Sequence, residues 1–286
     1  HHVSAITSDA RRAVDFHVGL LGLRLVKRTV DFDDPLTPHL YFGDATGAPG
    51  TLLTLFVWPG AHRGRQGIGQ VAVTSFAVRP DALGTWVGRL VARGVPYRGP
   101  VRRGAERVLS FADPDGLLLE IVGSDGAEER AAGSAAPGIP REHALRGLHA
   151  VTLWVDRPDD TDRVLVGALG MRPVRADEGT RRYAAGDGGP GALVDVRAIG
   201  GFVSGAEGAG TVHHVAWRAA DDGAALAVRG RLAAAGLLPT DLVDRRWFRS
   251  VYCREPSGIL HEVATDGPGM TVDEPAERLG ERLVLP

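Results

Sequence analysis

The sequence contains very little cysteine: Cys253 is the single thiol among 286 residues. One cysteine excludes an intramolecular disulfide and is typical of proteins in a reducing compartment. We therefore expect a cytoplasmic protein that is stabilised by a buried hydrophobic core, with Cys253 as part of that core.

Long hydrophobic runs and an excess of one charge are also missing. No run of about 18 apolar residues is present to span a membrane, and no charged start followed by an apolar stretch marks a signal peptide. The 33 basic and 35 acidic residues leave a formal net charge of -2. This balance gives no electrostatic basis for nucleic-acid binding, so we expect neither a membrane nor a nucleic-acid partner.

A strand–helix–strands pattern occurs four times along the chain. Apolar strands are predicted to begin at residues 2, 70, 148 and 212, and each is followed by a helix. The four predicted helices each stop before a glycine, and they cover residues 9–21, 81–93, 159–169 and 223–235. The repeat predicts an α+β fold built from four βαβββ modules.

The composition changes between the second and third modules. Residues 124–143 are rich in Gly, Ala, Ser and Pro, which is typical of a linker. We therefore expect an N-terminal domain over 1–123 and a C-terminal domain over 144–266, each with two modules. Residues 267–286 alternate charge with Leu and Pro and are expected to form a C-terminal arm.

Two His-His pairs and one acidic segment carry the chemistry. His1 and His2 open the first predicted strand, His213 and His214 lie in a later one, and Glu262 lies in the last. Two imidazoles and a carboxylate can form a facial ligand set that leaves positions open on a divalent metal. Non-haem Fe(II) oxygenases use such a set.

Strand geometry selects one histidine from each pair. Neighbouring residues on a strand point to opposite faces, so only one His of each pair is expected to enter a cavity. His2 shares its face with Ser4, whereas His1 and His213 share faces with apolar residues. The more polar faces therefore favour His2 and His214 as ligands.

Two further residues compete for a metal role. His149 opens the third module and is the alternative to His2, which would keep the site within residues 144–266. It shares its face with Val151 and Leu153, and this favours His2. Glu120 ends the second module as Glu262 ends the fourth, but its partner strand has no His, so a second metal site is not expected.

Six short segments, spread over most of the chain, carry a family resemblance: HHVS at 1–4, LVKRTV at 25–30, HLYFGD at 39–44, GAPGT at 47–51, RGLH at 146–149 and RSVY at 249–252. With the four modules, they resemble the vicinal oxygen chelate superfamily, which includes glyoxalases, fosfomycin and bleomycin resistance proteins and extradiol dioxygenases. The resemblance is closer to one branch, the hydroquinone ring-cleaving dioxygenases and their quinone-detoxifying relatives. Ser4 replaces the Thr usual in that branch and keeps the hydroxyl.

This resemblance implies a ring-cleaving dioxygenase whose metal ligands are His2, His214 and Glu262. It implies Fe(II) as the metal, with Mn(II) as the alternative, and a small aromatic diphenol and O2 as substrates. The diphenol would be of the hydroquinone type, with catechol as the alternative. Tyr252 is expected to hydrogen-bond the substrate hydroxyl, and Arg245 to stabilise its anionic oxygen.

The neighbours of the ligands are expected to support them. His1 and His213 would orient the ligands or relay protons, and Ser4 would donate a hydrogen bond inside the cavity. His39 has two open interpretations, as a site residue or as a structural strand-end residue. We expect the remaining histidines at the surface: His17, His62 and His143.

Two other functions on this scaffold stay open. One is a glyoxalase-type metal-dependent isomerase or a thiol-transfer resistance protein, and the other is a metal-free aromatic or drug-binding resistance protein. Four modules in one chain favour the dioxygenase over the isomerase or thiol-transfer protein. Three retained candidate ligands favour it over the metal-free binding protein. Function depends on these side chains and not on the fold. The oligomeric state stays open, with a homodimer as one alternative because relatives on this scaffold often form dimers.

Overall fold

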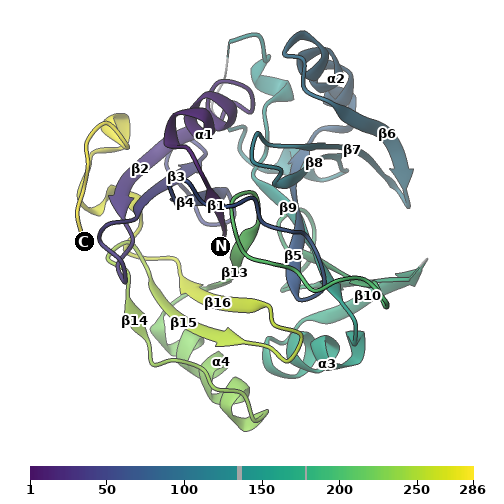
Figure 1. The fold of residues 1–286 in the computed structure, drawn as a ribbon, viewed down its shortest axis with the longest axis vertical. Coiled ribbons are helices and arrows are strands. Elements are labelled where there is room, and N and C mark those ends of the chain that lie inside the picture. The colour runs from purple at the N-terminus through teal and green to yellow at the C-terminus, as the bar shows by residue number, and fades with distance from the viewer. Residues whose placement is uncertain (134–136, 178) are drawn as a thin grey trace.

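The computed structural model describes residues 1–133, 137–177 and 179–286. Its strands form two eight-stranded sheets, which lie side by side in Figure 1. This arrangement confirms the α+β fold of four strand–helix–strands modules. No helix in the described ranges is long and apolar enough to cross a membrane.

The first sheet combines the first and fourth modules. The first module contains β1 (His2–Thr7), α1 (Ala10–His17), β2 (Arg24–Val30), β3 (Pro38–Gly43) and β4 (Leu52–Val57). The fourth contains β13 (Val212–Ala219), α4 (Asp222–Ala234), β14 (Val243–Asp244), β15 (Arg249–Arg254) and β16 (Leu260–Thr265). The strand order is β14-β15-β16-β13-β1-β4-β3-β2, with β1 and β13 antiparallel at the centre.

The second sheet combines the second and third modules. The second contains β5 (Gln70–Val78), α2 (Leu83–Ala92), β6 (Tyr97–Arg103), β7 (Glu106–Ala112) and β8 (Leu118–Gly123). The third contains β9 (Leu148–Val155), α3 (Pro158–Asp162), β10 (Arg172–Asp177), β11 (Thr180–Ala184) and β12 (Leu193–Ala198). Its order is β10-β11-β12-β9-β5-β8-β7-β6.

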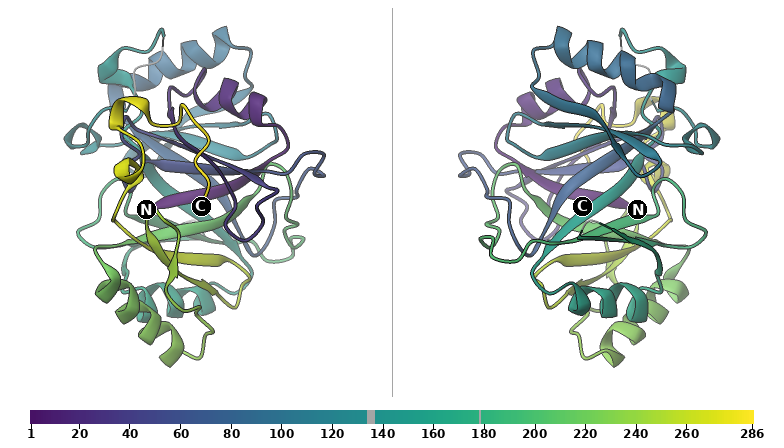
Figure 2. Two further views of the ribbon diagram at one scale, coloured as in Figure 1. Left: turned by 90° about the vertical axis from the view of Figure 1, so that its left-hand side faces the viewer. Right: turned by 90° about the vertical axis from the view of Figure 1, so that its right-hand side faces the viewer.

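Each sheet therefore joins a module from the first half of the chain to one from the second half. The helices follow the halves instead: α1 and α2 lie at one end of the molecule, and α3 and α4 lie at the other (Figures 1 and 2). The division into domains 1–123 and 144–266 stays a prediction about folding units.

The helix boundaries follow local sequence signals. Asp9 caps α1 by accepting a hydrogen bond from the backbone N–H of Arg12, and Asp221 caps α4 in the same way. The glycines that follow the four helical segments all adopt a positive φ, which favours glycine: Gly22 at 73°, Gly94 at 64°, Gly170 at 74° and Gly236 at 79°. In the third module the predicted helix is divided between α3 and a π-helical stretch, Arg163–Ala168.

One hydrophobic core extends through both sheets and the helices beside them. Val3 and Leu53 enter it from the first sheet, Phe76 from the second, and Trp86 from α2. Cys253 is buried in a smaller cluster, as predicted.

The prediction that His17 lies at the surface is wrong. His17 is fully buried, and its Nδ1 lies 2.9 Å from the carbonyl oxygen of Ala13 one turn earlier. Ala13 and Phe16 share the buried face of α1, so the i, i+3, i+4 spacing of a core-facing helix includes position 17. His62 is exposed and His143 is half-buried.

The C-terminal arm packs along β2, at the yellow end of the chain in Figure 1. The backbone N–H of Val284 donates to the carbonyl oxygen of Arg28 at 2.9 Å. Lys27 is fully buried, and its Nζ lies 2.6 Å from Asp273 and 2.5 Å from Glu274. Two carboxylates compensate the desolvation of this buried ammonium, so the ion pairs anchor the arm to the first module.

Candidate metal centre

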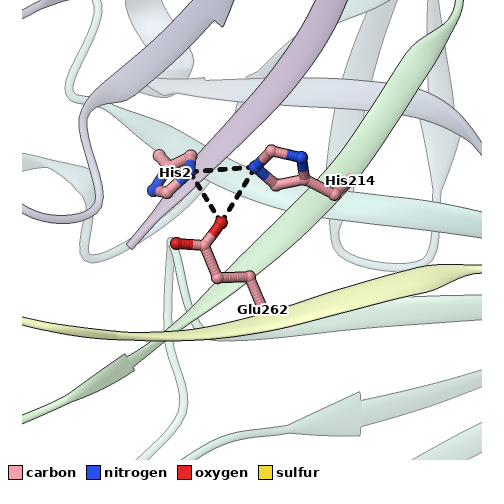
Figure 3. Close-up of side chains that lie close together, drawn as sticks. All are labelled: His2, His214 and Glu262. Atoms are coloured by element: carbon pink, nitrogen blue, oxygen red, sulfur yellow. Dashed lines mark hydrogen bonds and ion pairs between the residues drawn. The ribbon is translucent and has the colours of Figure 1, made fainter. Parts of the chain in front are cut away.

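The register of the first sheet brings the three predicted ligands to one face. His2 on β1 pairs with Ala216 on β13, which in turn pairs with Glu262 on β16. Ser4 pairs with His214, two residues before Ala216. Paired residues, and residues two apart on a strand, share a face of a sheet. The side chains of His2, His214 and Glu262 therefore project together from the three central strands (Figure 3).

The three side chains converge closely. The Nε2 atoms of His2 and His214 are 3.2 Å apart, and Oε2 of Glu262 lies 3.3 Å from the first and 2.9 Å from the second (Figure 3). All three residues are buried. Within the described ranges, this is the only group of three or more His, Cys, Asp or Glu whose ligand atoms lie within 4.8 Å of one another.

The geometry fits a divalent metal. Oε2 of Glu262 is buried and close to both imidazoles, yet it forms no hydrogen bond of acceptable geometry with the described residues. A buried carboxylate oxygen without a hydrogen bond, beside two imidazole nitrogens that contact each other, could ligate a metal ion together with them. Two His and one carboxylate suit a non-haem iron-type centre with open positions.

The protonation states also suit metal binding. Burial lowers the pKa of His2 below its ordinary value, so its imidazole is neutral near pH 7. Burial by itself would raise the pKa of Glu262, but His2 and His214 lower it well below the ordinary range. Neutral imidazole and ionised carboxylate are the forms that bind metal ions.

A neighbouring side chain holds each ligand. Nδ1 of His1 lies 2.9 Å from Nδ1 of His2, and Nδ1 of His213 lies 2.7 Å from Nδ1 of His214. Such contacts fix the ring orientation of ligand histidines. The Ser250 hydroxyl donates to Oε1 of Glu262 and leaves Oε2 facing the imidazoles. No sequence pattern singles out Ser250 as a site residue, although it lies in the matching segment at 249–252.

A cavity of about 510 Å³ opens over the three side chains. Much of its wall is aromatic, with Phe32, Phe56 and Phe248 among the lining residues. Ser4, Arg245 and Tyr252 also line it, as predicted from the sequence.

Arg245 bridges the cavity mouth. Its Nε donates to the Tyr252 hydroxyl at 3.2 Å, and its Nη2 lies 2.8 Å from Oδ2 of Asp33, which comes from the first module. Burial is the main cause that raises the pKa of Tyr252, so its hydroxyl stays protonated at neutral pH. Arg245 and Tyr252 therefore offer a positive charge and a hydroxyl donor at this side of the cavity.

The rule of one histidine per pair is right for the first pair and wrong for the second. His1 lies outside the cavity, whereas His213 lines it together with His214. The pairing of β1 with β13 passes from Ser4 and His214 to Ala5 and Val212, which leaves His213 without a partner. This β-bulge interrupts the strict alternation of faces.

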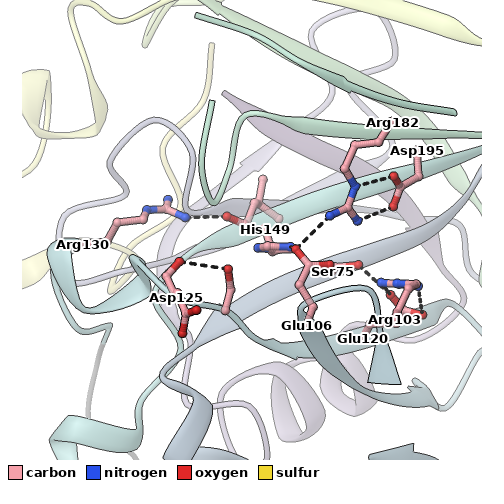
Figure 4. Close-up of polar contacts among 11 residues, drawn as sticks. Ser75, Arg103, Glu106, Glu120, Asp125, Arg130, His149, Arg182 and Asp195 are labelled. Atoms are coloured by element: carbon pink, nitrogen blue, oxygen red, sulfur yellow. Dashed lines mark hydrogen bonds and ion pairs between the residues drawn. The ribbon is translucent and has the colours of Figure 1, made fainter. Parts of the chain in front are cut away.

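His149 lies in the second sheet and does not join His214 and Glu262. Its Nε2 is 2.8 Å from Oε1 of Glu106, and Arg182 connects Glu106 to Asp195 (Figure 4). The geometry therefore brings together the ligand set that contains His2.

Glu120 is also bound by protein groups. Its carboxylate lies 2.7 Å from Nη2 of Arg103 and accepts a hydrogen bond from Ser75 at 2.9 Å (Figure 4). It takes part in an ion pair and not in a cluster of ligand atoms.

Comparison with known proteins agrees with the fold. Residues 1–121 match the Glyoxalase/Bleomycin resistance protein/Dioxygenase superfamily. The chain is 43% identical to MhqO of Bacillus subtilis (strain 168), which is named as a ring-cleaving dioxygenase, over all of this chain and 90% of that protein. It is 35% identical to the chlorohydroquinone/hydroquinone 1,2-dioxygenase of Sphingobium indicum, over 99% of this chain and 89% of that one.

Solved structures show the same architecture. A Bacillus subtilis crystal structure described as a dioxygenase superposes with a TM-score of 0.95 at 41% identity, covering 100% of this chain and 91% of that one. Glyoxalase I from Zea mays has a TM-score of 0.67 at 17% identity, covering 93% and 91%, and shares the fold. The chain therefore belongs to the Glyoxalase/Bleomycin resistance protein/Dioxygenase superfamily.

Proposed function

We propose that this protein is an Fe(II)-dependent ring-cleaving dioxygenase that inserts O2 into an aromatic diphenol of the hydroquinone type. The observation that carries the proposal is the convergence of His2, His214 and Glu262 in the wall of a cavity that is lined by several aromatic side chains. Relatives that are 34–43% identical over nearly the whole chain are named as ring-cleaving or hydroquinone dioxygenases, which supports it.

His2, His214 and Glu262 would hold the metal. When bound, Fe(II) supplies Lewis acidity toward a phenol oxygen and one-electron exchange with O2. The protein has to bind the aromatic ring, orient it and exclude bulk water. The Phe32, Phe56 and Phe248 rings provide the apolar surface that this requires.

Polar groups at the mouth would handle the substrate's charge and proton. The Arg245 guanidinium stabilises an anionic ring oxygen, and the Tyr252 hydroxyl donates a hydrogen bond to it. Asp33 holds Arg245 from the opposite module and limits its motion. Ser4 and His213 reach the same cavity from the central strands.

Oxygen uptake tests this proposal. Protein reconstituted with Fe(II) without air, then mixed with hydroquinone in aerated buffer, is expected to consume one O2 per diphenol, with loss of the aromatic absorbance. Glu262→Gln is the matched control and is expected to consume none. Absence of uptake by folded, iron-containing protein with hydroquinone and with catechol would overturn the proposal and favour an isomerase or a binding protein.

A further inference from the structure

The cavity has a second polar wall on β3. His39 and Tyr41 are two residues apart on this strand, so they share a face, and both line the cavity. Tyr41 pairs with Thr54 on β4, and Thr54 pairs with Ser4 on β1. The strands β3 and β15 lie on opposite sides of the ligand-bearing strands, so Tyr41 and Tyr252 flank the three ligands from two sides.

Tyr41 has hydrogen-bonding capacity that the protein leaves unused. Its side chain is 2% exposed, and its hydroxyl forms no hydrogen bond with any residue of the described ranges. Its ring packs between His39 and Trp247, with ring centres 4.4 and 5.6 Å apart. A tyrosine hydroxyl in largely apolar surroundings usually has a partner, and Tyr41 lines the cavity, so its hydroxyl is placed to bond a molecule there. Burial raises the pKa of Tyr41 well above its ordinary value, which keeps the hydroxyl a donor.

His39 is held in place from behind. Its Nε2 lies 2.7 Å from Oγ1 of Thr54, which lies 2.7 Å from Oγ of Ser4. Its ring stacks on Phe56 with centres 4.0 Å apart. No hydrogen bond of Nδ1 is found within the described part of the chain, and His39 lines the cavity, so this nitrogen is free to bond a molecule there. Burial lowers the pKa of His39 well below its ordinary value, so one ring nitrogen donates and the other accepts.

We propose that Tyr41 and His39 bind the second hydroxyl of a 1,4-diphenol, the one that lies across the ring from the oxygen at the ligand cluster. A phenol hydroxyl both donates and accepts, and this wall offers a hydroxyl donor beside an imidazole nitrogen. Arg245 and Tyr252 on the other side would serve the first oxygen. The inference rests on the proposed function, because it assumes that a diphenol occupies this cavity.

Binding without oxygen tests the inference apart from catalysis. Hydroquinone and phenol, which lacks the second hydroxyl, are titrated calorimetrically into Fe(II)-loaded protein under anaerobic conditions. Tyr41→Phe is expected to weaken hydroquinone binding about fivefold and to leave phenol binding unchanged, because it removes one hydrogen bond to the second hydroxyl. Tyr97→Phe is the matched control, since Tyr97 lies on β6 in the other sheet, and it is expected to change neither affinity.

Substitution of Thr54, whose hydroxyl contacts Nε2 of His39, gives a second, independent test. Thr54→Val removes the hydroxyl that holds His39 and is expected to weaken hydroquinone binding about threefold with little effect on phenol. Thr54→Ser, which keeps a hydroxyl, is expected to recover most of that loss. Thermal unfolding of each variant establishes that it is folded.

The outcomes separate the two proposals. If Tyr41→Phe weakens hydroquinone and phenol equally, or weakens neither, the β3 wall does not bind the second hydroxyl and the inference is overturned. Lack of oxygen uptake by the wild-type protein would instead overturn the proposed function. In that case, a loss of anaerobic hydroquinone affinity in Tyr41→Phe that phenol does not share would still support the binding role of this wall.

Discussion

The two sheets share one architecture but use their centres differently. In the first sheet, His2 pairs with Ala216, which pairs with Glu262. In the second sheet, the same succession runs from Ala150 through Ser75 to Glu120. The carboxylate is thus kept in both sheets, whereas an aliphatic residue stands in the second sheet where His2 stands in the first.

The second histidine is missing as well. Val73, two residues before Ser75 on β5, stands at the place that corresponds to His214. A cavity of about 610 Å³ persists beside Glu120, so the second sheet keeps the hollow but not the ligands. Without imidazoles, the carboxylate of Glu120 is bound by Arg103. The comparison indicates that two side chains, His2 and His214, and not the fold, distinguish the candidate metal centre from the ion pair of Glu120 and Arg103.

The largest expected effect comes from the carboxylate that both sheets keep. Glu262→Gln removes the anionic ligand itself. Losing a residue that only supports a ligand lowers metal affinity up to roughly a hundredfold, so this substitution is expected to lower it by more. Glu120→Gln, the matched variant in the second sheet, is expected to leave metal content unchanged. Metal analysis after desalting measures both, and full metal retention by Glu262→Gln would rule out this site.

The ion pairs of the second sheet should matter for stability and not for metal binding. Arg182→Met leaves the buried carboxylates of Asp195 and Glu106 without their cation and is expected to cost about 3–5 kcal/mol of unfolding free energy. Urea unfolding measures the loss. Arg197→Met on the same sheet alters an exposed arginine and should stay within about 0.5 kcal/mol of wild type. If Arg182→Met instead lost its metal and kept wild-type stability, the second sheet would be the metal-binding one, which contradicts the assignment of the metal to the first sheet.

Acid should weaken the same cluster, with a smaller effect. Burial by itself would raise the pKa of Glu106, but His149 and Arg182 lower it to about 2. A carboxyl whose pKa is lower in the folded state contributes stability above its unfolded pKa of about 4.5, and this contribution is lost as pH falls toward 2. Glu106→Gln should therefore flatten part of the decline in unfolding free energy between pH 4.5 and 3. An equally steep decline in this variant would contradict the assignment, and exposed Glu128→Gln is the control.

Local patterns predicted much of the fold. The N-cap at Asp9 and the glycines after each helix depend on a few neighbouring residues, so they are visible in the sequence. Two strands were missed, β6 and the two-residue β14. Most of β6 is exposed and it contains Pro100, so it lacks the apolar alternation that marks a strand.

The three candidate ligands were predictable from the sequence, whereas the residues that line the cavity were predicted only in part. The more polar strand faces favoured His2 and His214, and the family resemblance gave the full set with Glu262. Their convergence on one face depends on the pairing of β1, β13 and β16. The entry of His213 depends on a bulge between β1 and β13, two strands that are about 200 residues apart, and no local pattern reports such a register shift. The role of Tyr41 depends on which strand flanks the ligands, which is likewise a property of the assembled sheet.

The most direct test of the central claim is the iron content of three proteins: wild type, His2→Ala and His149→Ala. Each is reconstituted anaerobically with Fe(II), desalted and analysed for metal. We predict one iron per chain in wild type and in His149→Ala, and loss of iron in His2→Ala. Iron retained by His2→Ala and lost from His149→Ala would contradict the account and move the metal to a site that includes His149.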